Sequence, residues 1–135
     1  MRVLIADDSL AVVERLADLL KEIPGIQLVG IAQDAPEAIQ SIVEESPDAI
    51  ILDLQMPGGS GLEVLRTIRQ SHPSLCVLIC TNYPFSHYRA ECFAAGANYF
   101  LDKSAEFDKI PQIFRDLVER APNVATASQR EPPPT

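Results

Sequence analysis

Basic residues are scarce in this chain of 135 residues. Lys and Arg number 11 against 19 Asp and Glu, so the formal net charge at pH 7 is −8. A free-standing nucleic-acid-binding domain needs a basic surface to meet phosphate groups. The charge balance therefore predicts that this chain has no direct nucleic-acid partner.

Cysteines and long apolar segments are also few. Cys76, Cys80 and Cys92 are odd in number and lie in apolar or helical contexts, which is typical of buried cytosolic thiols rather than of disulfides or a zinc site. No apolar run approaches the roughly 20 residues of a membrane span, and residues 1–7 lack the layout of a signal peptide. We therefore expect a cytoplasmic protein without a membrane partner.

The stretch 48–59, Asp-Ala-Ile-Ile-Leu-Asp-Leu-Gln-Met-Pro-Gly-Gly, organises the rest of the chain. Its apolar run 49–52 is typical of a strand buried on both faces, and Pro57-Gly58-Gly59 ends the extended segment. Asp53 should therefore stand at the carboxyl end of a central strand, where open α/β sheets bind ligands. Taken alone, Asp53 is equally well explained as a residue that caps the following turn.

Strand and helix patterns alternate along the chain. Short apolar runs predict five strands, at residues 2–6, 26–31, 49–52, 75–80 and 98–101. Helical spacing of apolar residues, with N-cap signals at Ser9, Asp34 and Ser60, predicts helices between the strands and a last helix from about residue 108. In these helices we expect Leu10 and Val43 on the apolar faces and Arg69 on an outer face.

This alternation predicts an α/β fold: a five-stranded, parallel, doubly wound sheet of strand order 2-1-3-4-5 with helices on both faces, as in flavodoxin-like proteins. One domain should cover residues 1–121. Residues 122–135 are polar and end in three prolines before Thr135, which predicts a disordered tail and leaves no room for a second folded domain.

The predicted strand order gathers polar residues at one edge of the sheet. Asp7, Asp8 and Asp53 should converge there, with Thr81 and Lys103 on either flank. Three close carboxylates repel one another unless a cation is present, and Mg²⁺ prefers such oxygen ligands. A carboxylate can also attack phosphorus, while a lysine and a hydroxyl stabilise phosphoryl oxygens. The set predicts phosphoryl-transfer chemistry.

Each of these residues also has an ordinary explanation. Asp7 and Asp8 could serve a helix N-terminus, Thr81 could simply end a strand, and Lys103 could be a solvated surface charge. His72 and His87 are isolated, do not follow predicted strands, and are interpreted as surface residues rather than phosphoryl carriers.

The sequence resembles the receiver domain of bacterial two-component response regulators from about residue 2 to residue 120. The resemblance is carried by segments 3–9 and 51–58, by Thr81, and by segment 96–103. It implies that Asp53 accepts phosphate from a sensor histidine kinase or phosphotransfer protein. It also implies that Mg²⁺ is bound by Asp8, Asp53 and the backbone carbonyl of Gln55, with Asp7 acting through water.

The resemblance further implies a switch. Thr81 and Lys103 would hold the phosphoryl group, and Phe100 would turn inward when Thr81 moves. The surface of the fourth helix, fifth strand and fifth helix would then bind a downstream partner or, as an alternative, a second phosphorylated copy.

Four positions depart from the family pattern or vary within it. Ser104 replaces a proline that usually follows the lysine, often through a cis bond, so the geometry of this loop is in question. Asn82 is larger than the residue usual after the switch hydroxyl and could narrow access to the site. Gln55 and Tyr83 occupy positions that tune phosphoryl lifetime, and a bulky Tyr83 suggests slower hydrolysis.

Three alternatives to a single-domain phosphoacceptor remain at this point. The chain could be the N-terminal part of a DNA-binding transcription regulator, or a receiver that acts without phosphorylation. It could also be a phosphatase with an aspartyl nucleophile, but such enzymes need a second carboxylate two residues later, where Gln55 cannot transfer protons. We therefore expect a signalling domain rather than an enzyme.

Overall fold

The structure, a computed structural model, describes residues 1–120. The predicted disordered segment 122–135 and the predicted domain end at residue 121 lie outside the described residues. Five strands form the central sheet: β1 (Arg2–Ala6), β2 (Gln27–Ala32), β3 (Ala49–Leu52), β6 (Cys76–Thr81) and β7 (Tyr99–Asp102). All are parallel, in the order β2-β1-β3-β6-β7. The predicted fold class and strand order are confirmed.

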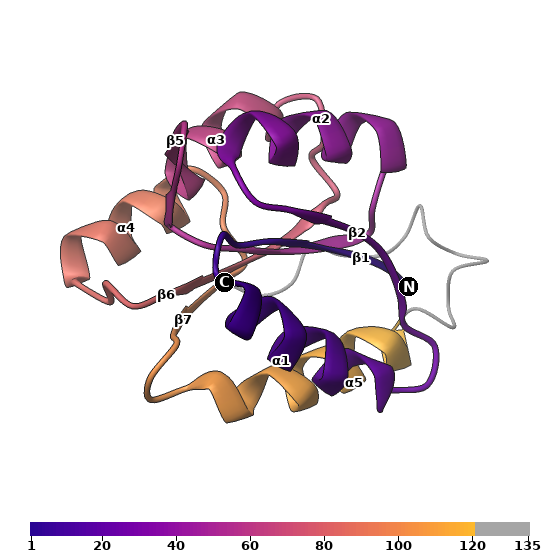
Figure 1. Cartoon of the computed structure of the whole chain (residues 1–135). Coiled ribbons are helices and arrows are strands. Elements are labelled where there is room, and N and C mark those ends of the chain that lie inside the picture. Colours follow the sequence, from indigo (N-terminus) through magenta and orange to yellow (C-terminus); the bar gives the residue numbers. More distant parts are fainter. Residues whose placement is uncertain (121–135) are drawn as a thin grey trace.

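Helices cover both faces of the sheet (Figure 1). Helices α1 (Leu10–Lys21) and α5 (Ile110–Arg120) lie on one face, and α2 (Ala35–Glu45) and α3 (Gly61–Ile68) lie on the other. Helix α4 (Ser86–Ala94) packs on the α2–α3 face near β7, and a 3₁₀ turn, η1 (Phe107–Lys109), precedes α5. No helix within residues 1–120 has both the length and the apolar character needed to cross a membrane.

The core is divided by the sheet because side chains of a strand alternate between its faces. In β3, Ala49 and Ile51 join the cluster under α1 and α5, while Ile50 and Leu52 join the cluster under α2 and α3. All four are buried. This double burial explains the unbroken apolar run that precedes Asp53.

Three helices begin at the capping residues that the sequence indicated. The side chains of Ser9, Asp34 and Ser60 accept hydrogen bonds from the backbone N–H three residues later. At Ser60 the bond is reciprocated by Glu63, which completes a capping box and fixes the start of α3.

A small hairpin that the sequence analysis did not predict follows β3. Strands β4 (Gln55–Met56) and β5 (Gly59–Ser60) pair antiparallel, and Gly58 and Gly59 have φ values of +79° and +146°. Only glycine adopts such values without strain. The chain therefore turns back immediately after Asp53 and enters α3.

Three side-chain expectations were wrong. Leu10 and Val43 are 63% and 61% exposed, because Leu10 opens α1 and Val43 lies one position beyond the buried face that ends at Ile42. Arg69, expected to point outward, is partly buried and binds backbone carbonyls.

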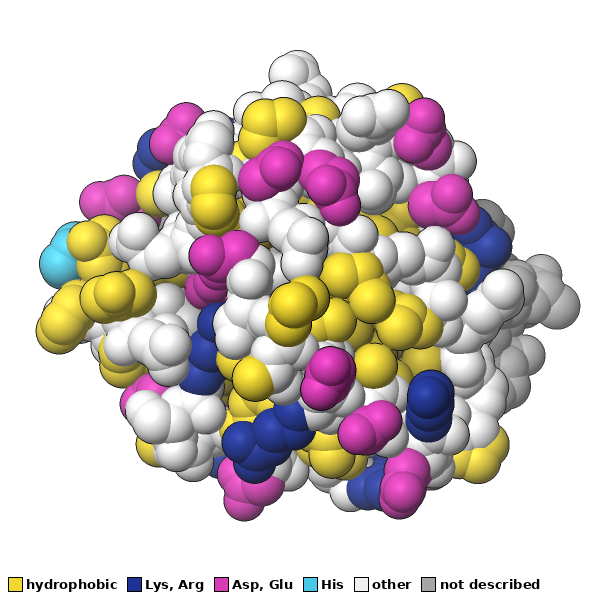
Figure 2. Space-filling model, in the orientation of Figure 1, with side chains coloured by type: hydrophobic (Ala, Val, Ile, Leu, Met, Phe, Trp, Pro, Cys, Tyr) yellow, Lys and Arg dark blue, Asp and Glu magenta, His cyan; other side chains and the backbone are white. Residues whose placement is uncertain are grey.

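In Figure 2, hydrophobic side chains also reach the surface in the middle of the view, over the edge strand β2, whose residues up to Ile31 are incompletely buried.

Candidate functional site

The sheet brings the predicted site residues to its carboxyl edge. Asp7 directly follows β1, Asp53 directly follows β3, Thr81 is the last residue of β6, and Lys103 directly follows β7. The backbone fixes two of them: the Asp53 N–H donates to the Ala6 carbonyl at 2.9 Å, and the Asp7 N–H extends the pairing with β2. The neighbouring positions of β1 and β3 therefore set the distance between the two carboxylates.

The three predicted carboxylates form one cluster. Asp7, Asp8 and Asp53 each offer an oxygen, and these oxygens lie within 4.8 Å of one another. Asp7 is 3% exposed and Asp53 is 6% exposed, whereas Asp8 faces solvent. An all-oxygen donor set with one open side suits a hard divalent cation such as Mg²⁺. The donor chemistry fits the predicted metal.

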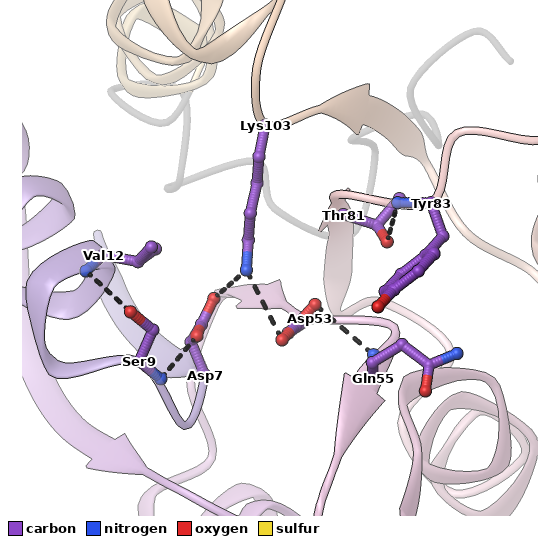
Figure 3. A network of polar contacts seen from close by, with 8 residues as sticks. All are labelled: Asp7, Ser9, Val12, Asp53, Gln55, Thr81, Tyr83 and Lys103. Atoms are coloured by element: carbon purple, nitrogen blue, oxygen red, sulfur yellow. Dashed lines mark hydrogen bonds and ion pairs between the residues drawn. The ribbon is translucent and has the colours of Figure 1, made fainter.

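The side chain of Lys103 points toward Asp7 and Asp53, as Figure 3 shows. Its Nζ lies 2.6 Å from Asp7 Oδ2 and 3.4 Å from Asp53 Oδ2. The lysine side chain is only 7% exposed. The ammonium group therefore faces both buried carboxylates and is closer to Asp7.

Burial and charge shift the pKa values of this pair. Desolvation raises the pKa of Asp53 to about 6; the charge of Lys103 lowers it and that of Asp7 raises it. Desolvation alone would lower the pKa of Lys103, but the hydrogen bond to Asp7 and the charge of Asp53 outweigh it, so the pKa is raised. Lys103 thus stays protonated, while Asp53 is ionised at neutral pH only against a desolvation cost.

Thr81 and Gln55 lie on the other side of Asp53. Thr81 is fully buried, and its Oγ1 accepts the backbone N–H of Tyr83 at 2.9 Å. Because that bond uses a lone pair, the hydroxyl proton stays available for an acceptor. The backbone N–H of Gln55 donates to Asp53 Oδ1 at 3.4 Å, which orients the carboxylate. In Figure 3, Tyr83 extends from the end of β6 on the Thr81 side of the site.

Gly61 packs directly against the backbone of Asp53, a role that the sequence analysis missed. A Cβ at Gly61 would overlap the backbone carbonyl oxygen of Asp53. The Gly61 N–H also donates to the Leu54 carbonyl at 2.9 Å. The close approach of α3 to the Asp53 backbone therefore requires glycine at this position. The sequence signal was its place directly after the cap Ser60.

The loop after Lys103 is built without proline. No cis peptide bond occurs within residues 1–120. Asp102 Oδ1 accepts both the backbone N–H and the hydroxyl of Ser104, at 2.9 Å and 2.7 Å. Ser104 therefore takes part in a side-chain-closed turn, which answers the question that its presence raised.

Phe100 and the histidines have clear positions. Phe100 is 4% exposed and already packs in the core under α4, with the guanidinium of Arg89 5.8 Å from its ring centroid. His87 is exposed on α4, and His72 lies beyond the end of α3. Neither histidine joins the acidic cluster.

Comparison with known proteins identifies the family. Residues 3–115 match the response regulator receiver domain, so the chain belongs to the receiver-domain family of two-component signalling proteins. Receiver domains generally bind Mg²⁺ at an acidic pocket and interact with histidine kinases and phosphotransfer proteins. In the part of this chain that the structure describes, Asp7, Asp8 and Asp53 form an acidic cluster.

Three relatives illustrate the similarity. The chain is 34% identical to a protein-glutamate methylesterase/protein-glutamine glutaminase from Anaeromyxobacter dehalogenans, with 99% of this chain and 38% of that protein covered. It is 33% identical to response regulator GacA from Pseudomonas viridiflava, with 85% of this chain and 54% of that protein covered. A LuxR-family response regulator structure from Aurantimonas has a TM-score of 0.80 at 32% identity, with 87% and 84% covered. The chain thus spans about two fifths of the length of the methylesterase/glutaminase and about half of the length of GacA.

Proposed function

We propose that this chain is a response-regulator receiver domain that accepts a phosphoryl group on Asp53 from a histidine kinase or phosphotransfer protein. The observation that carries the proposal is the juxtaposition of Asp53 with Lys103, 3.4 Å away, and with two further carboxylates. This combination suits an in-line phosphoryl transfer, in which positioning and charge stabilisation are the main tasks of the protein.

In the proposed reaction, a carboxylate oxygen of Asp53 attacks phosphorus and forms an acyl phosphate. The bond from phosphorus to the donor breaks, and the leaving group takes the bonding electron pair and a proton from solvent or donor. Lys103 leaves Asp53 for a phosphoryl oxygen while remaining near Asp7, and the Thr81 hydroxyl donates to another oxygen. Both groups stabilise negative charge on the transferred group.

The residues proposed to hold Mg²⁺ are Asp8, Asp53 and the backbone carbonyl of Gln55, with Asp7 acting through water. The bound ion supplies positive charge for the phosphoryl oxygens. Asp8 is the open, solvent-facing donor, and the ionised form of Asp53 is required both as a ligand and as the nucleophile.

We further propose that phosphorylation is transmitted through Thr81. If the Thr81 hydroxyl moves toward a phosphoryl oxygen, its bond with the Tyr83 N–H must lengthen, so the segment leading into α4 is disturbed. Helix α4 is suited to respond, because Cys92 is its one fully buried residue. Phe100, a residue of β7 whose side chain packs in the same apolar cluster as α4, would report this change on the α4–β7–α5 surface.

The proposed partner surface carries exposed aromatic side chains. Phe85 is 55% exposed, and its ring lies near those of His87 and Tyr88 at the start of α4. At the left of Figure 2, hydrophobic side chains lie next to a histidine in the region of α4. A downstream protein, or a second phosphorylated copy, would bind here; rings of this kind are frequent interface anchors.

The test is intact mass after incubation with acetyl phosphate, with and without Mg²⁺. The wild type should gain one phosphoryl group only with Mg²⁺, and hydroxylamine should remove it, as expected for an acyl phosphate. Asp53→Asn should gain none, while Asp18→Asn, at an exposed position on α1, should behave as the wild type. A phosphoryl adduct retained in Asp53→Asn, or a wild type that gains none from acetyl phosphate or from a phosphorylated kinase, would contradict the proposal.

A second candidate is that this receiver forms part of a longer regulator. The observation in its favour is the coverage of the relatives, of which the chain spans 38% and 54%. An open reading frame that continues past Thr135 into a helix-turn-helix region would decide for it. Steady turnover of a phosphomonoester by the purified chain would instead favour an aspartyl phosphatase.

A further inference from the structure

The turn that carries Lys103 is closed by side chains. Asp102 Oδ1 accepts two hydrogen bonds from Ser104, as described above. Asp102 and Glu106 also exchange two: the Asp102 N–H donates to Glu106 Oε1 at 3.1 Å, and the Glu106 N–H donates to the Asp102 carbonyl at 2.8 Å. Glu106 is held in turn by Lys109, whose Nζ lies 2.8 Å from its Oε2. The residues on both sides of Lys103 are therefore bonded to one another.

Lys103 itself depends on this backbone for its position. Its N–H donates to the Thr81 carbonyl at 2.8 Å, which fixes the start of the side chain at the end of β6. A lysine side chain has four flexible carbon–carbon bonds, and holding it in one conformation costs roughly 2 kcal/mol of rotamer entropy. Nζ reaches Asp7 and Asp53 only if its Cα stays where the turn holds it.

The charges of the turn support the same arrangement. The two hydrogen bonds from Ser104 lower the pKa of Asp102, and the hydrogen bond from Lys109 lowers that of Glu106. Both carboxylates therefore remain charged acceptors at neutral pH, and a charged acceptor makes the stronger hydrogen bond. Both residues are half-buried, whereas the ammonium that they help to place is buried.

We propose that Asp102, Ser104 and Glu106 are positioning residues that hold Lys103 Nζ at the acidic cluster. Their effect on phosphoryl transfer rests on the function proposed above. Their effect on the position of Lys103 does not, so the two can be tested separately.

The first arm of the experiment measures exposure of Lys103 by amine acetylation and mass spectrometry, with the exposed Lys21 as internal reference. In the wild type, Lys103 should react much more slowly than Lys21. Asp102→Ala should raise the Lys103 rate about tenfold, because two hydrogen bonds to a charged acceptor are lost. Asp102→Asn, which keeps the Oδ1 acceptor but not its charge, should raise the rate clearly less than Asp102→Ala, and the surface control Glu119→Ala should stay close to the wild type.

Ser104→Ala and Glu106→Ala supply independent variants should Asp102→Ala fail to fold, and each should raise the Lys103 rate. Unchanged Lys103 labelling in the folded variants would overturn the proposal. So would equal labelling in Asp102→Ala and Asp102→Asn, since the acceptor oxygen would then not matter.

The second arm measures the rate of phosphoryl adduct formation in a double-mutant cycle. Asp102→Ala should slow the rate in the wild-type background and have no further effect in Lys103→Ala. Equal losses in both backgrounds would show that Asp102 acts other than through Lys103 and would overturn the proposal. If the wild type forms no adduct, the proposed function fails, while the labelling arm still decides whether the turn holds Lys103.

Discussion

Asp53 combines burial with the negative charge that the proposed phosphoryl transfer requires. The residue is 6% exposed, and its pKa is raised to about 6 by desolvation, in spite of Lys103. Lys103 Nζ lies 0.8 Å closer to Asp7 than to Asp53, from distances of 2.6 Å and 3.4 Å. Asp53, the proposed nucleophile, is thus the less compensated of the two buried carboxylates. A strained charge of this kind is typical of a residue kept for chemistry rather than for stability.

Replacing Asp53 should make the metal-free protein more stable in a pH-dependent way. Between pH 3.8 and about 6, the unfolded chain releases a proton that the folded chain retains at Asp53, so the free energy of unfolding falls as pH rises. Asp53→Asn lacks this loss. The gain in the free energy of unfolding of Asp53→Asn over the wild type should be absent below pH 4 and reach on the order of 2 to 3 kcal/mol above pH 6.

Urea unfolding in EDTA at several pH values measures this difference. Asp18→Asn controls for the removal of a negative charge from an exposed position. An advantage of Asp53→Asn that is the same at pH 4 and pH 8 would contradict the account of Asp53 as a buried, undercompensated carboxylate.

Gly61 should tolerate no side chain. In Gly61→Ala, the added methyl group overlaps the Asp53 carbonyl oxygen, so the backbone of α3 or Asp53 must shift. We expect a loss of roughly 2 to 4 kcal/mol in the free energy of unfolding and slower phosphorylation. Gly30→Ala is the matched control, because its Cβ would meet only the end of the flexible Leu4 side chain, at 3.0 Å. Thermal unfolding of both variants tests this, and equal losses would contradict it.

At the residue scale, the sequence predicted the polar residues of the site but not the residues and contacts that hold them in place. Asp7, Asp53, Thr81 and Lys103 each follow or end an apolar run, so their convergence followed from strand order alone. The preference of Lys103 for Asp7 depends on side-chain geometry, to which no sequence spacing corresponds.

At the scale of elements, Arg69 ties the end of α3 to the two strands that follow. Its guanidinium lies between segments far apart in sequence and donates to the oxygens of His72, Pro73, Leu75, Gly96 and Asn98. Helical periodicity placed this arginine on the outer face. Helical periodicity takes into account only the helix itself. The conformation of Arg69 is set by hydrogen bonds to carbonyls of loops beyond the end of the helix, which periodicity cannot predict.

Arg69→Ala should therefore destabilise the protein by roughly 2 to 3 kcal/mol, because partly buried carbonyls lose a charged donor. Arg66→Ala, on the same helix, removes only an exposed ion pair with Glu91 at 3.8 Å and should cost less than about 0.5 kcal/mol. Chemical denaturation of both variants measures the contrast. Similar losses would indicate that the helix surface, not the loop carbonyls, determines the effect.

At the scale of the whole molecule, the buried residues of the two apolar layers all lie between residues 3 and 117 of the described chain. The cluster under α2 and α3 runs from Leu4 to Phe100, and the cluster under α1 and α5 runs from Val3 to Leu117. The alternation of strands and helices was sufficient to predict this arrangement, because parallel crossovers leave few topologies. The hairpin of β4 and β5 after Asp53 was missed because each of its strands has only two residues, too few for a periodicity.

Removal of residues 122–135 should leave the melting temperature unchanged to within about 2 °C, because the buried residues of both described apolar layers lie within residues 3–117. Calorimetry of the full chain and of residues 1–121 measures this. A drop of several degrees would mean that the removed segment packs on the domain, contrary to the tail predicted from its composition.

The position of Tyr83 has an optical consequence. The chain contains no tryptophan, and Tyr83 is 46% exposed on the Thr81 side of the site, with its backbone N–H bonded to the Thr81 hydroxyl. A single tryptophan substituted for Tyr83 would be the only indole in the molecule. Its fluorescence would follow events at Asp53 without background from elsewhere, so the protein offers a natural place for a reporter of the proposed phosphorylation.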